Sequence, residues 1–222
     1  MNNSKSKIKI AAVIPFFNER NTLGEVINKT LKYVDCVIAV DDGSTDDSVS
    51  FILDSENVIL LKLQQNQGKG FALKSGLTKA IQIGCNAVVT LDADLQHNPD
   101  EIPELISQLN KYDIIVGNRL KNLKGMPVQR RLSNLITSFL LTIKTGQKII
   151  DSQCGFRAYR EEVIKNVTTL NKGYEAESEL LIKASRLGYS IGSSDISTIY
   201  GAETSKMKPI RTTFRFIRVL FS

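Results

Sequence analysis

The sequence predicts an α/β protein with a largely parallel sheet covered by helices. Short apolar runs alternate with longer segments of helical periodicity through the first half of the chain. Such alternation is typical of parallel strands joined by right-handed helical crossovers. The run 87–91 is apolar on both faces, as a strand between two helix layers must be. With 222 residues, 42% of them hydrophobic, the chain can bury a sizeable core without metals or disulfides.

Five strands and four connecting helices are expected up to Arg119. The strands are Ile8–Ile14, Val37–Val40, Val58–Leu63, Ala87–Leu91 and Ile114–Gly117. The helices are Thr22–Tyr33, a segment from the turn Asp41–Asp46 to about Leu53, Phe71–Ile83 and Pro99–Asn110. Gly84 favours a helix end because glycine adopts the left-handed conformation that often follows the last turn.

The pattern changes after Arg119. A loop over 120–127 precedes a helix from about Val128 to Ile143, a strand at Gly155–Tyr159 and a helix over roughly Glu175–Leu187. We expect this last third to pack onto one end of the sheet. The predicted organisation is one domain over residues 1–208 and an amphipathic basic helix over 209–222.

Charge and composition limit the partners and the compartment. The 29 Lys and Arg exceed the 23 Asp and Glu, which gives a formal charge of +6 that suits nucleic acid, anionic lipid or phosphate-bearing small molecules. The three cysteines have no metal-binding spacing, which favours thiols in a reducing compartment. We find neither a signal-peptide pattern nor the roughly 20 apolar residues that span a bilayer. A cytoplasmic protein, soluble or peripheral on the inner face of the membrane, is therefore expected.

Distinctive polar segments follow all five strands of the first half. They are 15–19 (PFFNE), 41–46 (DDGSTD), 66–70 (NQGKG), 92–97 (DADLQH) and 117–119 (GNR). Ligands of open parallel sheets bind beyond the carboxyl ends of the strands, so the five segments predict one site. Asp92 and Asp94 suit a hard divalent cation that bridges two phosphates, and Gln96 adds a carbonyl oxygen. Alone, the two carboxylates would equally suit a turn or a helix N-cap.

These segments, in this order, resemble family 2 glycosyltransferases with the GT-A fold, a Rossmann-like α/β architecture. DADLQHNPD and DSQCGFRAYR further resemble the polyprenol-phosphate branch, to which dolichol-phosphate mannosyltransferase belongs. The resemblance covers about residues 8–208. It implies an inverting hexosyltransferase that uses Mg²⁺ or Mn²⁺, a UDP- or GDP-linked sugar donor and a polyprenyl phosphate acceptor.

The resemblance also implies a donor site. Its residues would be Pro15, Phe17, Glu19, Asp41, Asp42, Gly68, Lys69, Asp92 and Ala93, with the metal on Asp92, Asp94 and Gln96. Phe17 stands where the family usually has tyrosine, which keeps the stacking area but removes a hydroxyl. The alternatives are that Asp41 and Asp42 cap a strand-to-helix turn and that 66–70 is an ordinary loop. The single histidine, His97, is expected to be structural.

An acceptor side is expected after the fifth strand. The resemblance places the acceptor phosphate on Arg119, Arg130, Arg131, Ser133, Asn134 and Lys206, and catalytic roles on Asp94, Arg119 and Arg130. Guanidinium groups suit this task because they fork onto phosphate oxygens and stay charged. The alternative for 129–134 is a solvated basic helix start. Glu175 and Glu179 would share a helical face, whereas Glu177 would point elsewhere.

Other functions remain open from the sequence. A hydroxyl acceptor needs a general base, whereas a phosphate acceptor needs only positioning and charge screening, so the arginines favour phosphate. Transfer to a saccharide hydroxyl in cell-envelope synthesis, sugar-nucleotide formation by a nucleotidyltransferase, and a binding module without catalysis are the alternatives. Nucleic acid is disfavoured because aromatic residues do not interleave with the basic runs.

The last residues bear on membrane contact. Ile210, Phe214, Ile217 and Phe221 recur at helical spacing, and Arg211, Arg215 and Arg218 each follow one residue behind. A helix of this type suits an anionic membrane surface. Its alternative is to pack the apolar stripe on the domain.

Overall fold

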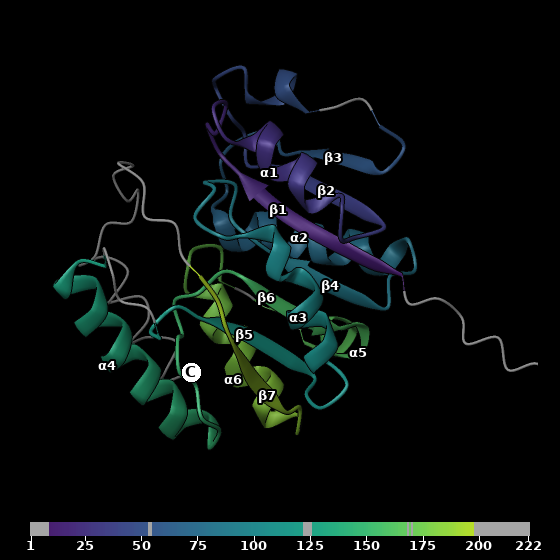
Figure 1. Cartoon of the computed structure of the whole chain (residues 1–222). Coiled ribbons are helices and arrows are strands. Elements are labelled where there is room, and N and C mark those ends of the chain that lie inside the picture. The colour runs from purple at the N-terminus through teal and green to yellow at the C-terminus, as the bar shows by residue number, and fades with distance from the viewer. Residues whose placement is uncertain (1–8, 53–54, 122–125, 168, 170, 198–222) are drawn as a thin grey trace, which may run out of the picture.

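The computed structural model describes residues 9–52, 55–121, 126–167, 169 and 171–197, which form a seven-stranded sheet with helices on both faces (Figure 1). The strand order is β3-β2-β1-β4-β6-β5-β7, and only β6 runs antiparallel to its neighbours. The strands are β1 Ile10–Phe16, β2 Cys36–Asp41, β3 Val58–Lys62, β4 Ala87–Thr90, β5 Ile114–Asn118, β6 Arg157–Arg160 and β7 Ile191–Asp195.

Helices cover both faces of this sheet. They are α1 Leu23–Thr30, α2 Lys69–Gln82, α3 Ile102–Gln108, α4 Val128–Thr145, α5 Glu161–Asn166 and α6 Ala176–Arg186, with short 3-10 turns at Ser48–Phe51 and Pro99–Glu101. In Figure 1, α1 and α3 lie in front of the sheet, whereas α2, α5 and α6 lie behind it. The long helix α4 packs beside α6, at the outside of the molecule (Figure 1).

The core lies between the central strands and the helices. Every residue of β2, β4 and β5 is buried, which explains why these strands are apolar on both faces. Gly76 allows α2 to approach β1 closely, because a Cβ there would lie 2.3 Å from Val13 Cγ1. This close packing fixes the position of α2, whose first residue is Lys69.

The α/β fold and the five strands of the first half are confirmed. The helix predicted to follow the Asp41–Asp46 turn is wrong: the described residues there form only the 3-10 turn Ser48–Phe51. The four residues fall in a segment rich in Asp and Ser, and those side chains bond to nearby backbone instead of supporting a long helix.

The prediction that the last third packs onto one end of the sheet is also wrong. β6 inserts between β4 and β5, and β7 adds an edge strand next to β5. The sequence Arg-Ala-Tyr-Arg of β6 carries little apolar signal because it contains two arginines, yet the Arg157 side chain is fully buried. Its guanidinium donates to the carbonyl oxygens of Ser152, Cys154 and Glu177.

Two sequence predictions lie outside the described residues, namely Lys206 and the amphipathic helix 209–222. Within the described ranges, none of the helices has both the length and the apolar character that a bilayer-crossing segment needs.

Candidate active site

The carboxyl ends of β1, β2, β4 and β5 share one edge of the sheet because these strands are parallel to one another. The polar segments that follow these strands therefore lie together, as the sequence predicted. The charge of Asp92 and, more weakly, that of Glu19 act on Asp94, and the charge of Arg119 acts on Asp92. Residues from three strand ends thus contribute to one electrostatic environment.

Asp41 and Asp42 hold the backbone of two loops. Asp41 Oδ1 accepts a hydrogen bond from the Ser44 amide at 2.8 Å. The two Asp42 oxygens accept from the amides of Gln67 and Gly68 at 2.8 and 2.9 Å. Burial raises the pKa of Asp42 despite these bonds. Both carboxylates therefore shape the loops beside the site, and their contact with a donor nucleotide stays a prediction.

The loop held by Asp42 leads into α2 and places Lys69. Gly68 has a φ of 100°, a left-handed conformation, and a Cβ there would lie 2.5 Å from the Lys172 carbonyl oxygen. Glycine is thus required both by the backbone and by the space. The Lys69 side chain begins α2 at the carboxyl edge of the sheet.

Lys69 forms two ion pairs with acidic groups from different elements. Its Nζ lies 2.6 Å from Asp92 Oδ1 and 3.1 Å from Glu177 Oε1. Burial opposes the charge on Lys69, but the two carboxylates outweigh it and raise the Lys69 pKa. Burial likewise opposes ionisation of Asp92, and Lys69 overcomes it, so the Asp92 pKa lies well below its usual range. Both groups are therefore charged near neutral pH.

The position of Glu177 corrects the sequence analysis. We expected Glu177 to point away from a face shared by Glu175 and Glu179, but it is Glu177 that reaches into the site. Glu179 instead accepts two hydrogen bonds from Asn171 and pairs with Lys183. Helical spacing shows which residues share a face, but only the placement of α6 beside α2 decides which face meets the site.

Asp94 carries negative charge that a divalent cation would complement. Burial and the neighbouring Asp92 charge raise the Asp94 pKa to about 6. Asp94 Oδ1 accepts from the Gln96 amide at 3.1 Å across a turn in which Leu95 has a φ of 60°. Asp92 and Asp94 with the Gln96 side-chain oxygen form an all-oxygen set, which is the chemistry that Mg²⁺ and Mn²⁺ prefer. The predicted metal residues therefore fit the ion.

Asp92, Asp94 and Gln96 would supply only part of the coordination shell of such a cation. Among the described residues, no group of three or more His, Cys, Asp or Glu side chains is arranged to hold a metal. A cation at Asp92 and Asp94 would consequently leave coordination positions for water or phosphate oxygens, as Mg²⁺ sites commonly do.

His97 has the structural role that the sequence predicted. Its ring is buried, stacks on Phe156 with a centroid separation of 5.3 Å, and Nδ1 accepts from the Asp92 amide at 3.3 Å. Burial lowers the His97 pKa to about 4. The ring is therefore neutral near pH 7. Its Nδ1 lone pair accepts the hydrogen bond from the Asp92 backbone amide.

Arg119 is fixed by a buried carboxylate that sequence reasoning assigned no role. Asp151 accepts from Arg119 Nε and Nη2, both at 2.8 Å, and from the Arg119 amide at 3.1 Å. Asn134 Nδ2 donates to the same carboxylate at 2.7 Å. Burial would raise the Asp151 pKa, but the Arg119 hydrogen bonds and charge lower it. The only sequence signal for Asp151 is its place in the motif DSQCGFRAYR.

The other predicted acceptor residues lie along the first turns of α4. Arg130 is half-buried, Arg131 is exposed, and Ser133 Oγ accepts from Gln153 Nε2 at 3.2 Å. Asn134 is only 1% exposed, so its described contacts are with protein groups. We infer from them that Asn134 acts by orienting Asp151, and direct phosphate contact by Arg130, Arg131 and Ser133 stays a prediction.

Three further predicted donor residues occupy the edges of this site. Pro15 lies in β1 opposite Val40, Phe17 is half-buried just after β1, and Ala93 is buried between the two carboxylates. Gly155, from the motif that contains Asp151, brings its backbone against the site. A Cβ there would lie 3.0 Å from both Asp92 Oδ2 and Lys69 Nζ.

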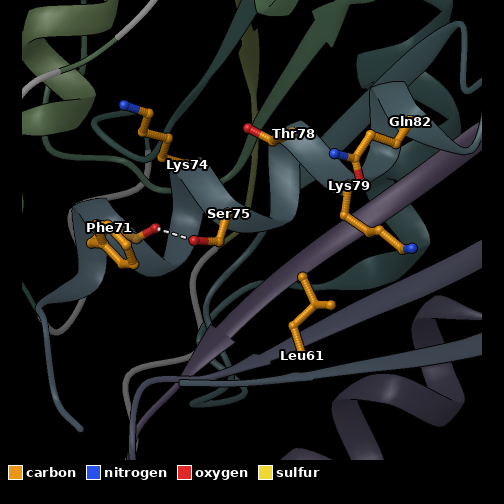
Figure 2. A pocket seen from close by; sticks show the side chains of 7 residues that line it. All are labelled: Leu61, Phe71, Lys74, Ser75, Thr78, Lys79 and Gln82. Carbon is orange, nitrogen blue, oxygen red and sulfur yellow. Dashed lines mark hydrogen bonds between the residues drawn. The ribbon is translucent and has the colours of Figure 1, made fainter. Parts of the chain in front are cut away.

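A separate shallow hollow lies between α2 and the edge strand β3 (Figure 2). Figure 2 shows Phe71 and Ser75 on the wall, where Ser75 Oγ donates to the Phe71 carbonyl oxygen at 3.0 Å. None of the side chains that line it belongs to the predicted site: they are Leu61, Phe71, Lys74, Ser75, Thr78, Lys79 and Gln82.

The pairing of Arg119 with Asp151 predicts a large effect on stability. We expect Asp151→Asn to lower the free energy of unfolding by about 3 kcal/mol, because it leaves a buried guanidinium without its counter-charge. The difference from wild type should be complete above about pH 5 and shrink at lower pH, since the lowered pKa makes Asp151 stabilising only while ionised. Urea denaturation at several pH values measures it.

Asp195→Asn is the matched control, because Asp195 and its partner Lys121 are both well exposed. Exposed ion pairs contribute little, so no measurable change in unfolding free energy is expected. Equal destabilisation by the two substitutions would contradict the role given to Asp151.

Comparison with known proteins identifies the family. The model of the family described as "Glycosyl transferase family 2" matches residues 11–168. A UDP-N-acetylglucosamine–dolichyl-phosphate N-acetylglucosaminyltransferase from Methanococcus voltae is 34% identical over 86% of each chain. An undecaprenyl-phosphate 4-deoxy-4-formamido-L-arabinose transferase from Proteus mirabilis is 33% identical over 70% of this chain and half of its own length.

Solved structures confirm the fold. Glucosyl-3-phosphoglycerate synthase from Mycobacterium tuberculosis, crystallised with Mn²⁺, UDP-glucose and phosphoglyceric acid, superimposes with a TM-score of 0.78. The two are 24% identical, and the match covers 98% of this chain and 80% of that one. The motifs, the GT-A sheet and the match over most of the chain lead to one conclusion: the chain belongs to glycosyltransferase family 2.

Proposed function

We propose that this glycosyltransferase moves a sugar, with inversion, from a UDP- or GDP-linked donor to a polyprenyl phosphate. The observation that carries the proposal is the buried Arg119 guanidinium, held by Asp151 and lying within the electrostatic reach of Asp92. A fixed cation beside the predicted donor carboxylates suits a reaction in which both substrates carry phosphate. Two relatives named as polyprenyl-phosphate sugar transferases support the same acceptor class.

A phosphate acceptor also agrees with the state of His97. The imidazole is neutral and buried, and its Nδ1 lone pair is engaged with the Asp92 amide, so it does not accept a proton from a substrate hydroxyl. A phosphate oxygen is already anionic and attacks without a base, provided it is positioned. Arg119 and Arg130 are the groups proposed to position it.

The donor would lie along the carboxyl ends of β1, β2 and β4. Pro15, Phe17, Glu19, Asp41 and Asp42 would line the nucleoside, while Lys69 supplies a fixed positive charge beside Asp92. Mg²⁺ or Mn²⁺ on Asp92, Asp94 and Gln96 would neutralise the leaving diphosphate. Structures of glucosyl-3-phosphoglycerate synthase in complex with UDP and Mn²⁺ or Mg²⁺ support this part of the proposal.

The acceptor lipid implies where the enzyme works. We propose a peripheral protein at the cytoplasmic face of the membrane, where an isoprenoid tail stays in the bilayer and its phosphate reaches the surface. The basic surplus of the chain suits that anionic surface.

A donor and acceptor screen tests the proposed reaction. The full chain is incubated with Mg²⁺ or Mn²⁺, undecaprenyl or dolichyl phosphate in detergent, and each UDP- or GDP-sugar in turn. We expect one donor to yield a lipid-linked sugar by mass spectrometry, with release of the matching nucleoside diphosphate. Transfer only to soluble hydroxyl acceptors, or pyrophosphate release from a sugar 1-phosphate and a nucleoside triphosphate, would contradict the proposal.

The proposed metal role predicts the effect of one substitution. Asp94→Asn should lower kcat by roughly a hundredfold or more, because the amide is a poor ligand for the ion that stabilises the leaving diphosphate. Initial rates across a Mn²⁺ titration measure it. Asp100→Asn is the control, since Asp100 is exposed and bonds Tyr33 outside the site. A full rate for Asp94→Asn would show that the metal role is wrong.

The acceptor assignment predicts a separate kinetic signature. Arg130→Gln should raise KM for the polyprenyl phosphate by about tenfold and leave KM for the donor unchanged, because the lost guanidinium no longer pairs with phosphate. The two KM values are measured at saturating co-substrate. A change confined to the KM for the donor would contradict the assignment of Arg130 to the acceptor phosphate.

A further inference from the structure

The long helix α4 presents an apolar surface to the outside of the molecule. Six of the ten large hydrophobic side chains that are exposed among the described residues lie on it: Val128, Leu132, Leu135, Ile136, Phe139 and Ile143. At 3.6 residues per turn they occupy about 100° of the helix circumference. Together they form one continuous stripe, named here the α4 stripe, which includes Val128 at 80% exposure and Phe139 at 64%.

The opposite face of α4 attaches the helix to the domain through polar groups. Asn134 donates to Asp151, and Thr137 and Ser138 hydrogen-bond Ser152. All three of these α4 residues are buried. A helix on a globular protein normally buries its apolar stripe and exposes its polar one. In α4 this arrangement is inverted, so the stripe is not a packing surface of the described domain.

An exposed apolar surface of this kind marks an interaction site, and the charge around it selects the partner. Residues 127–150 contain four basic residues and neither Asp nor Glu. Three of the basic residues, Arg131, Lys144 and Lys148, are exposed, and no ion pair links them to another described residue. The partner should therefore be apolar in its interior and negatively charged at its surface.

Charge also separates the possible occupants. In a symmetric dimer through the α4 stripe, each basic helix would face its own copy, and like charges would be juxtaposed. Residues 209–222 of this chain include Arg211, Arg215 and Arg218 and no acidic residue, so they would also bring like charge. Of these three occupants, an anionic lipid surface is the one that complements both the stripe and the basic residues beside it.

We infer that α4 docks on an anionic lipid bilayer through the α4 stripe, with the helix lying in the interfacial plane. Apolar side chains would enter the region between headgroups and acyl chains, while the basic residues contact anionic headgroups. Arg130 lies on the same helix, in its first turn. If the proposed function holds, this docking brings the acceptor-binding end of α4 to the level at which a lipid phosphate emerges.

Vesicle binding tests the inference in the absence of donor, metal and polyprenyl phosphate. The full chain is sedimented with vesicles of equal parts phosphatidylcholine and phosphatidylglycerol, and with vesicles of phosphatidylcholine alone. The test variant is Leu132→Glu with Phe139→Glu. We expect its partition onto the anionic vesicles to fall at least about tenfold, because two apolar side chains no longer insert and two repulsive charges are added.

The matched control is Leu187→Glu with Phe51→Glu. Leu187 is 58% exposed, as is Leu132, and Phe51 is 45% exposed, but neither lies on α4. Because both variants change the charge equally, binding of the control within about twofold of wild type shows that position on α4 matters. If the test variant does not fold by circular dichroism, Leu132→Ser with Phe139→Ser takes its place.

Three outcomes would overturn the inference. The test variant could bind the vesicles as wild type does, the control could lose as much vesicle binding as the test variant, or vesicle binding could fall only when residues 209–222 are deleted. A wild-type dimer that the test variant converts to monomer while vesicle binding persists would assign the α4 stripe to a second copy. Because no sugar transfer is measured, failure here is distinct from failure of the proposed reaction, which the detergent screen decides.

Discussion

The ion pair between Lys69 and Asp92 is the interaction on which the site and its surroundings depend. Lys69 begins α2, Asp92 follows β4, and Glu177 in α6 contributes the second carboxylate. Charges removed from water must be paired, so these three elements have to meet at the carboxyl edge of the sheet. The Asp42 loop contacts and the glycine at position 68 then serve to deliver Lys69 to that point.

A second buried ion pair, between Arg119 and Asp151, holds together the predicted acceptor side of the site. Its carboxylate accepts from the end of β5 and from α4, so one group holds the predicted acceptor cation and also anchors the helix. Since polar contacts anchor α4, its apolar residues are left outward. Asp151 thus links the guanidinium of the site to the helix that carries the outward apolar surface.

Much of the fold follows from local sequence. Runs such as Ala87–Thr90 are apolar throughout because both faces of the strand are buried, and this property is visible without coordinates. The strand predicted at Gly155–Tyr159 is β6, but its place between β4 and β5 was not predicted, because Arg157 and Arg160 make it too polar to indicate an interior strand. It is stable in the sheet interior only because buried carbonyl oxygens accept the Arg157 hydrogen bonds. Pattern alone does not reveal a partner that lies on another element.

The site, too, has features that the sequence predicts and features that depend on the tertiary structure. The sequence by itself determined the family and the segments that carry the chemistry, because parallel strands align their carboxyl ends and the motifs follow those ends. Only the tertiary structure decided that Glu177 faces Lys69, that Asn134 orients Asp151, and that the apolar side of α4 faces outward. The physical reason is that helical periodicity defines two faces of a helix, whereas the assignment of each face depends on pairings between residues far apart in the chain.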